Sequence, residues 1–250
     1  MRAPDHGPLL TAIAFLTRVP VRPAAGARGG DLVRAAALFP LVGAALGALV
    51  GGAAAALALA LPALLAATIA VALELALTGA LHVDALADSA DGLGGRDVEH
   101  ALEIMRDHSL GAYGTAALVL DLLAKATALA ALAEAGAVLP VVAAFAVSRA
   151  APLPLAAALP YARSDAGTGA ALVGRLGSRA ATAGVALAGG LAFLATGAHA
   201  AATLACPLVV VAAVGTLARR RLGGVTGDVL GASTELTATV ALIVAVATRG

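Results

Sequence analysis

The chain has 250 residues, of which 61% are hydrophobic and only 12% are charged, about half the charged share of an ordinary soluble domain. A formal net charge of +1 argues against a nucleic-acid-binding protein, and the single cysteine, Cys206, excludes an internal disulfide. These values predict an all-α, polytopic membrane protein. We expect one integral-membrane domain over residues 1–250, a bundle of transmembrane helices.

The chain opens with a short apolar segment, Leu9–Leu16. Its shortness, and the presence of Arg18 and Pro20 directly after it, favour an interfacial segment over a cleaved signal peptide.

Longer apolar segments follow along the rest of the chain and predict about seven membrane spans, within a range of six to eight. The predicted spans are Ala37–Leu61, Ala63–Leu81, Ala112–Leu132, Val138–Leu159, Gly184–Thr196, Thr203–Leu217 and Val229–Thr248. The fifth and sixth are short and could form one broken hairpin around His199 and Pro207.

The arginines predict how these spans are oriented. With an odd number of spans and the N-terminus in the cytoplasm, most of the 16 basic residues lie on the cytoplasmic side. The connections on that side hold Arg96 and Arg106, then Arg163, Arg175 and Arg179, then Arg219, Arg220 and Arg221. We therefore expect a cytoplasmic N-terminus.

Three aspartates follow the second predicted span: Asp84, Asp88 and Asp91. Each would cost about 2.5–3.5 kcal/mol at the bilayer centre, so we expect them at the membrane surface, on the cytoplasmic face. On a helix they lie within about 60° of one face, where their charges repel unless a divalent cation joins them. They are therefore candidate metal ligands and catalytic carboxylates; the alternative is a solvated acidic helix end.

His82 precedes the aspartates and lies about 160° from Asp84 on a continuing helix, so we expect it to face elsewhere. A catalytic role, as general base or as a positioning residue, is one interpretation. An interfacial histidine without chemistry is the other.

Glycines follow the acidic run at Gly92, Gly94 and Gly95. They would end a helix and let the backbone approach a ligand closely. Beside three acids, they predict contacts to a phosphate-bearing substrate.

A second polar motif, residues 223–232, opens the last predicted span on the same side of the membrane. Its Asp228 lies among glycines at a helix start, where backbone N–H groups favour anions. We predict that Asp228 joins the metal ligands and that Thr226 and Gly227 bind substrate; a plain N-terminal cap is the alternative for Asp228.

The segment Asp97–Asp107 mixes charged and apolar residues and predicts an amphipathic helix on the membrane surface. At its end, Arg106 and Asp107 precede two glycines and the third predicted span. We predict that both bind substrate. The alternative is a helix cap with a tight turn.

Ionisable residues also lie inside the predicted spans, where they need partners. Asp121 and Lys125 are four residues apart and are expected to pair on one helix face. Glu74 and Arg149 are alone in their spans. Glu74 lies about 15 Å from Asp84 along a helix, too far to share a metal ion with it.

Acids for Mg²⁺, glycine turns for phosphates and nearby arginines together predict Mg²⁺-dependent phosphoryl or nucleotidyl transfer. The sequence offers no Ser-His-Asp triad, cysteine nucleophile, P-loop or zinc-ligand set.

Over almost its whole length the chain resembles the cobalamin synthase family, the adenosylcobinamide-GDP ribazoletransferases. Four segments carry the resemblance: residues 14–21 (AFLTRVPV), 39–43 (FPLVG), 77–92 (LTGALHVDALADSADG) and 224–232 (GVTGDVLGA), the last followed by Glu235. The resemblance implies a Mg²⁺-dependent, multi-pass enzyme of the bacterial inner membrane, with its aspartates holding the ion on a diphosphate.

The resemblance also implies the reaction. The ribose 3′-hydroxyl of α-ribazole, or of its 5′-phosphate, attacks the phosphate on the aminopropanol arm of adenosylcobinamide-GDP. GMP leaves, and adenosylcobalamin or its 5′-phosphate is formed. The lipid bilayer is the expected surroundings, and a homo-oligomer or association with other late corrinoid-pathway enzymes stays open.

Two other functions fit parts of the sequence less well. Residues 91–96 resemble the start of a CDP-alcohol phosphotransferase signature, but Met105 stands where that signature needs a glycine. An ion-coupled transporter would use Glu74, Asp121, Lys125 and Arg149, yet most acids are expected at one membrane surface, which favours catalysis.

Overall fold

The computed structural model describes residues 7–21, 29–107, 109–164 and 168–248. These residues form helices joined by short connections, and the β contact found among them is an isolated bridge between Tyr161 and Val225. The prediction of an all-α fold is confirmed. The helices are α1 Pro8–Leu16, α2 Gly29–Ala36, α3 Phe39–Ala58, α4 Ala63–Thr78, α5 Leu81–Gly92, α6 Val98–Ile104, α7 Ala112–Glu134, α8 Val138–Ala150, α9 Pro152–Ala158, η1 Thr168–Ala171, α10 Ser178–Thr196, η2 Gly197–His199, α11 Ala200–Leu222 and α12 Gly227–Ala247.

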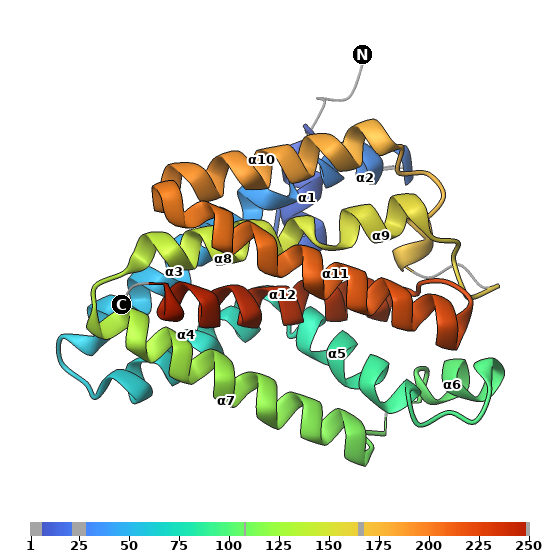
Figure 1. Ribbon diagram of the computed structural model, residues 1–250, viewed down its shortest axis with the longest axis horizontal. Helices are drawn as coiled ribbons and strands as arrows, with labels where there is room; N and C mark the ends of the chain where they lie inside the picture. Colours follow the sequence, from blue (N-terminus) through green and yellow to red (C-terminus); the bar gives the residue numbers. More distant parts are fainter. Residues whose placement is uncertain (1–6, 22–28, 108, 165–167, 249–250) are drawn as a thin grey trace.

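Five helical stretches of the described chain are long and apolar enough to cross a membrane. They are Phe39–Ala58, Ala112–Glu134, Val138–Ala158, Ser178–Leu222 and Gly227–Ala247, with a sixth if α4 and α5 together form one bent crossing. This confirms a polytopic membrane protein. The stretch Ser178–Leu222 comprises α10 and α11, which are joined by the 3-10 turn η2 and run back along each other (Figure 1). Seven crossings, and the orientation of the N-terminus, stay predictions.

The centre of the bundle is formed by α8 and α12, the most deeply buried of these stretches. Small residues let α3 approach α8 closely: a Cβ at Gly43 would clash with the Phe145 carbonyl oxygen, and one at Gly47 would lie 2.8 Å from the Val141 carbonyl oxygen. Close backbone approach is how helices associate in a bilayer, where lipid is as apolar as the side chains.

A 90° bend between α4 and α5 sets the direction of the acidic helix. Gly79 and Ala80 both have positive φ, +65° and +58°, and a Cβ at Gly79 would collide with the Arg18 side chain. α5 spans 12 residues, about 18 Å, which is shorter than the roughly 30 Å hydrocarbon core. It also holds His82 and three aspartates, so we place α5 outside the membrane-spanning segments.

The two ends of the bundle differ (Figure 1). The α5–α6, α9–α10 and α11–α12 connections gather at one end, and the α3–α4, α7–α8 and α10–α11 turns at the other, near the C-terminus. The first end is called the polar end below, because the arginines of the predicted cytoplasmic side lie in these connections or in the helix ends next to them. Alternation of spans thus brings the start of α12 beside α5, as the sequence predicts.

Candidate active site

A cavity lies at the polar end, and it and its mouth hold about 680 Å³ of empty space. Its ionisable lining residues come from three helices: His82 and Asp84 from α5, Arg149 from α8 and Asp228 from α12. The two acidic motifs, more than half the chain apart, therefore share one cavity. We call it the site cavity.

Close packing of α5 on α12 brings the two carboxylates together. A Cβ at Gly231 would clash with the Cβ of Ala85, so only glycine allows this approach without a shift. Asp84 is exposed, and Asp228 is partly buried at the start of α12. The site is therefore built where two helix starts meet rather than along one helix face.

Asp228 is held in place by a cation and a hydroxyl group. Its Oδ2 accepts a hydrogen bond from the Arg163 guanidinium at 2.8 Å and one from the Thr226 hydroxyl at 3.3 Å. The Arg163 guanidinium also donates to the Met105 carbonyl oxygen at 3.3 Å. Arg163 therefore links α12 to the end of α6 and supplies positive charge beside the carboxylates.

Arg163 reaches this position through backbone pairing. The Ala162 N–H donates to the Val225 carbonyl and the Val225 N–H donates to the Pro160 carbonyl, both at 2.9 Å. A Cβ at Gly224 would clash with that Pro160 carbonyl oxygen. The strand-like contact thus fixes the segment after α9 against the turn before α12.

Asp88 lies one turn after Asp84, and its charge interacts with those of Asp84, Asp228 and Arg163. The pKa of Asp88 is raised to about 6, mainly by burial and then by the negative charges of Asp84 and Asp228, while Arg163 opposes the rise. Three mutually repelling carboxylates with one opposing arginine form a cation-binding environment.

Asp91, predicted as a metal ligand, has other partners in the structure. Its two carboxylate oxygens accept hydrogen bonds from the backbone N–H groups of Gly111 and Gly114, at 2.7 and 2.8 Å. A Cβ at either glycine would clash with the Asp91 carboxylate. Asp91 thus satisfies free N–H groups at the start of α7 and favours its dipole. The expectation that all three aspartates point at one ion is corrected here.

His82 and Asp84 both line the site cavity, although His82 was expected to face away from Asp84. The two side chains have different surroundings, since Asp84 is exposed whereas His82 is buried near Arg149 and Lys125. Burial lowers the pKa of His82 well below its ordinary value, and the two cations lower it further. Its imidazole is therefore neutral near pH 7 and a weak base.

The predicted substrate-binding glycines fall into two groups. Gly227 lines the cavity and lies against Gly169, where an added Cβ would be 2.7 Å from the Gly227 Cα. Gly92 and Gly95 instead make room for α6: a Cβ at Gly95 would lie 2.5 Å from the Ala101 Cα. The space they leave is thus filled by protein rather than by a ligand.

Gly94 and Thr226, which were also predicted to bind substrate, have protein groups as their neighbours. Gly94 is exposed next to the Tyr113 ring, where a Cβ would lie 3.3 Å from it. Thr226 is fully buried, and its hydroxyl accepts the Val229 N–H at 3.2 Å as the N-cap of α12. Thr226 therefore caps α12 and is too deeply buried to contact a substrate. The cap of α12 is thus Thr226, whereas Asp228 lines the site cavity and pairs with Arg163.

Arg106 and Asp107 are exposed after α6, whose bounds Val98–Ile104 agree with the predicted surface helix. The Asp107 Oδ1 accepts the Ser109 N–H at 3.0 Å, the tight-turn arrangement that was the alternative. Neither residue lines the site cavity. A role in holding a substrate that extends beyond the cavity stays a prediction.

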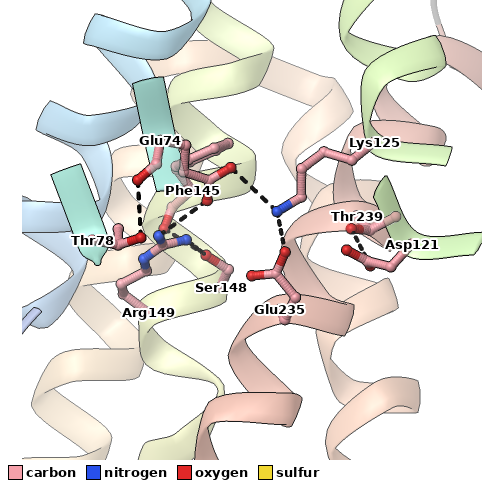
Figure 2. Close-up of polar contacts among 9 residues, drawn as sticks. All are labelled: Glu74, Thr78, Asp121, Lys125, Phe145, Ser148, Arg149, Glu235 and Thr239. Carbon is pink, nitrogen blue, oxygen red and sulfur yellow. Dashed lines mark hydrogen bonds and ion pairs between the residues drawn. The ribbon is translucent and has the colours of Figure 1, made fainter. Parts of the chain in front are cut away.

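A buried ion-pair network lies deeper in the bundle (Figure 2). Lys125 contacts Glu74 at 3.2 Å and also Glu235, and Arg149 contacts Glu74 at 3.4 Å. Asp121 instead accepts a hydrogen bond from Thr239 at 2.7 Å. The predicted Asp121–Lys125 pair is therefore corrected, because α4 and α12 bring carboxylates to Lys125 across the bundle. Glu74 and Arg149, which were expected to need partners because each is alone in its span, contact each other.

The structure also contributes site residues that the sequence reasoning did not single out. Arg149 lines the site cavity, and its Nε has no hydrogen-bond partner among the residues that the structure describes, although Arg149 is fully buried. Arg163 and Gly169 reach the site through turns. Charge inside a span was a signal for Arg149, whereas nothing local marked the other two.

The described residues include carboxylates that could bind a metal ion, but these are not arranged as a complete set of ligands. Among the residues described, no group of three or more His, Cys, Asp or Glu side chains is arranged to hold a metal ion. Asp84, Asp88 and Asp228 nonetheless interact electrostatically, and all three are oxygen donors of the kind that Mg²⁺ takes. The donor chemistry fits Mg²⁺, and the ligand set stays a prediction.

Fold and cavity together define a polytopic, all-α membrane protein with an acidic cavity at the polar end of its bundle. Comparison with known families gives the particular family. The chain belongs to the cobalamin-5-phosphate synthase family, whose sequence model matches residues 8–246.

Curated relatives agree with this membership. The chain is similar to the adenosylcobinamide-GDP ribazoletransferase of Sinorhizobium medicae, at 42% identity over 90% of each chain. It is also similar to the adenosylcobinamide-GDP ribazoletransferases of Syntrophobacter fumaroxidans, at 38% identity over 90% of this chain and 92% of the relative, and of Chlorobaculum tepidum, at 40% over 91% and 90%. No solved structure matches the chain.

Proposed function

We propose that this protein catalyses the last assembly step of adenosylcobalamin. It joins adenosylcobinamide-GDP to α-ribazole, or to α-ribazole 5′-phosphate, and releases GMP. The observation that carries the proposal is the meeting of Asp84 and Asp228 in one cavity of a chain that belongs to the cobalamin-5-phosphate synthase family. Relatives that match it over about 90% of its length are named for this transfer.

The reaction breaks a phosphoanhydride bond of the diphosphate and forms a phosphate ester bond. The ribose 3′-oxygen of the acceptor forms a bond to the phosphate on the corrinoid arm, the bond from that phosphate to GMP breaks, and the hydroxyl proton is lost. His82 lines the cavity, and its neutral imidazole can orient the acceptor hydroxyl group. Its lowered pKa makes it a weak base, so a carboxylate of the site is better suited to take that proton. Arg163, beside Asp228, offers positive charge to the phosphates.

The three clustered carboxylates suit a divalent cation. We propose that Asp84, Asp88 and Asp228 hold Mg²⁺, with Asp91 bracing α7 instead of binding the ion. Bound there, Mg²⁺ would neutralise charge on the diphosphate and on the departing GMP.

We further propose that the enzyme lies in the bacterial inner membrane with the site cavity on the cytoplasmic face. Five apolar helical stretches support a multi-pass membrane protein. The cavity and the arginine-bearing connections share one end of the bundle, and basic residues are enriched on the cytoplasmic side.

The test is an assay of the purified protein in detergent with Mg²⁺, adenosylcobinamide-GDP and α-ribazole. We expect adenosylcobalamin and GMP in equal amounts. Asp84→Asn and Asp228→Asn should each lower turnover about a hundredfold, because a lost metal or phosphate contact costs several kcal/mol in the transition state. Glu134→Gln, an exposed acid at the end of α7, is the matched control and should leave turnover unchanged.

No product under conditions in which a characterised relative is active would refute the assignment. Full activity of Asp228→Asn would remove that residue from the chemistry. Product formed equally well in excess chelator would remove the metal from the proposal.

A further inference from the structure

One part of the site cavity is unused by the phosphate chemistry. Phe15 and Phe39 line it and stack on each other, with ring centroids 5.5 Å apart and planes 9° from parallel. Leu172 lines it as well. Phe39 and Leu172 are buried, and Phe15 is partly buried against the core, so the group forms a fixed wall. We call it the aromatic wall.

The aromatic wall and the carboxylates come from different elements. Phe15 and Phe39 belong to α1 and α3, and Leu172 directly follows η1, whereas Asp84 and Asp228 lie in the first turns of α5 and α12. A ligand that fills this cavity meets apolar and aromatic surface from one set of elements and charged groups from the other. The complementary molecule has a flat apolar part and a hydroxylated part.

We propose that the site cavity is the acceptor site, in which the aromatic wall binds the benzimidazole base of α-ribazole and the ribose lies toward Asp84 and Asp228. This inference rests on the proposed function and adds to it the residues that select the acceptor. The two-ring base gains stacking and apolar burial against Phe15 and Phe39. The ribose 3′-hydroxyl then faces the carboxylates where transfer occurs.

The donor fits this wall less well. Guanine carries donors and acceptors around its edge, and burying them against phenylalanine and leucine would leave them without hydrogen-bond partners, which weakens binding. A dimethylated benzimidazole has a single free ring nitrogen and otherwise apolar edges. The corrinoid ring is also too large for this cavity, so only its phosphate arm could enter.

Steady-state kinetics with each substrate varied in turn test this placement. In Phe15→Ala, the KM for α-ribazole should rise about tenfold, since an aromatic contact contributes on the order of 1.4 kcal/mol. The KM for adenosylcobinamide-GDP should stay within about twofold of wild type. Phe193→Ala, which truncates an exposed phenylalanine on α10, is the matched control and should change neither constant.

Acceptor selectivity gives a second readout. Wild-type enzyme should prefer α-ribazole over the analogue whose benzimidazole lacks both methyl groups, and Phe15→Ala should weaken that preference, because the methyl groups lose their contact surface. Phe15→Leu keeps apolar volume but not the ring, and it serves if Phe15→Ala does not fold. It should fall between wild type and Phe15→Ala.

Calorimetric binding of α-ribazole to the protein without donor separates this inference from the proposed function. Binding that weakens about tenfold in Phe15→Ala supports the aromatic wall as the base site, even if no transfer is measured. An active enzyme in which Phe15→Ala raises only the KM for adenosylcobinamide-GDP, or leaves both constants unchanged, would overturn it.

Discussion

Replacing Lys125 by methionine should destabilise the protein strongly. The Lys125 ammonium lies 3.2 Å from a Glu74 carboxylate oxygen and also contacts Glu235, and all three side chains are almost fully buried. Glu74 has Arg149 as a second cationic partner, whereas the ion pair described for Glu235 is the one with Lys125. Lys125→Met would therefore leave a buried carboxylate without its counter-charge.

The expected cost follows from that loss. Breaking a buried ion pair by removing one partner costs about 3–5 kcal/mol, because the remaining charge is left uncompensated. For a chain of this size, that corresponds to a fall in Tm of about 6–20 °C. Methionine fills much of the lysine volume, so a cavity adds little to the effect.

Thermal unfolding in detergent, followed by circular dichroism, measures the effect. Lys125→Met combined with Glu235→Leu removes both members of the pair and leaves Glu74 with Arg149, so it should recover most of the lost stability. Arg179→Met, at an exposed arginine of α10, controls for loss of any positive charge. A single Lys125→Met variant as stable as wild type, or a double variant less stable than the single one, would refute the reasoning.

Further predictions concern the polar end. Asp91→Ala should lower the free energy of unfolding by about 1–2 kcal/mol, the value of a lost helix cap, and leave the Mg²⁺ concentration for half-maximal activity unchanged; a large shift in that concentration would return Asp91 to the metal ligands. Gly231→Leu should abolish transfer without blocking membrane insertion, because a side chain there pushes α5 away from α12; wild-type turnover would contradict this packing. Because the pKa of Asp88 is raised to about 6, this carboxyl is protonated below pH 6, and a protonated carboxyl binds cations weakly. The Mg²⁺ requirement should therefore rise as pH falls from 7 to 5 in wild type, and a titration of Asp88→Asn should lack that rise.

The sequence by itself determined the class of protein and the location of its site. Hydrophobic length is a local property, so the apolar segments could be read directly, and each predicted span corresponds to a helix of the structure. Because successive spans alternate in direction, Asp84 and Asp228 had to fall at the same end of the bundle. Motif resemblance gave the family and the reaction.

Tertiary structure alone decided which way each polar side chain points. The 90° bend at Gly79 and Ala80 sets the direction of α5, and with it the position of the cavity that His82 and Asp84 both line. Lys125 was expected to pair with Asp121 on its own helix, but it pairs with Glu235 on α12. Asp91 was expected to bind a metal ion, but its carboxylate accepts a backbone N–H from Gly114 on α7.

The same limit explains the aromatic wall of Phe15, Phe39 and Leu172. Spacing along a chain fixes which residues share a helix face, but not what another helix presents to that face. The choice between a metal ligand, a helix cap and a buried ion pair is therefore made by packing, since it depends on which charged or polar group a distant segment brings within hydrogen-bonding distance.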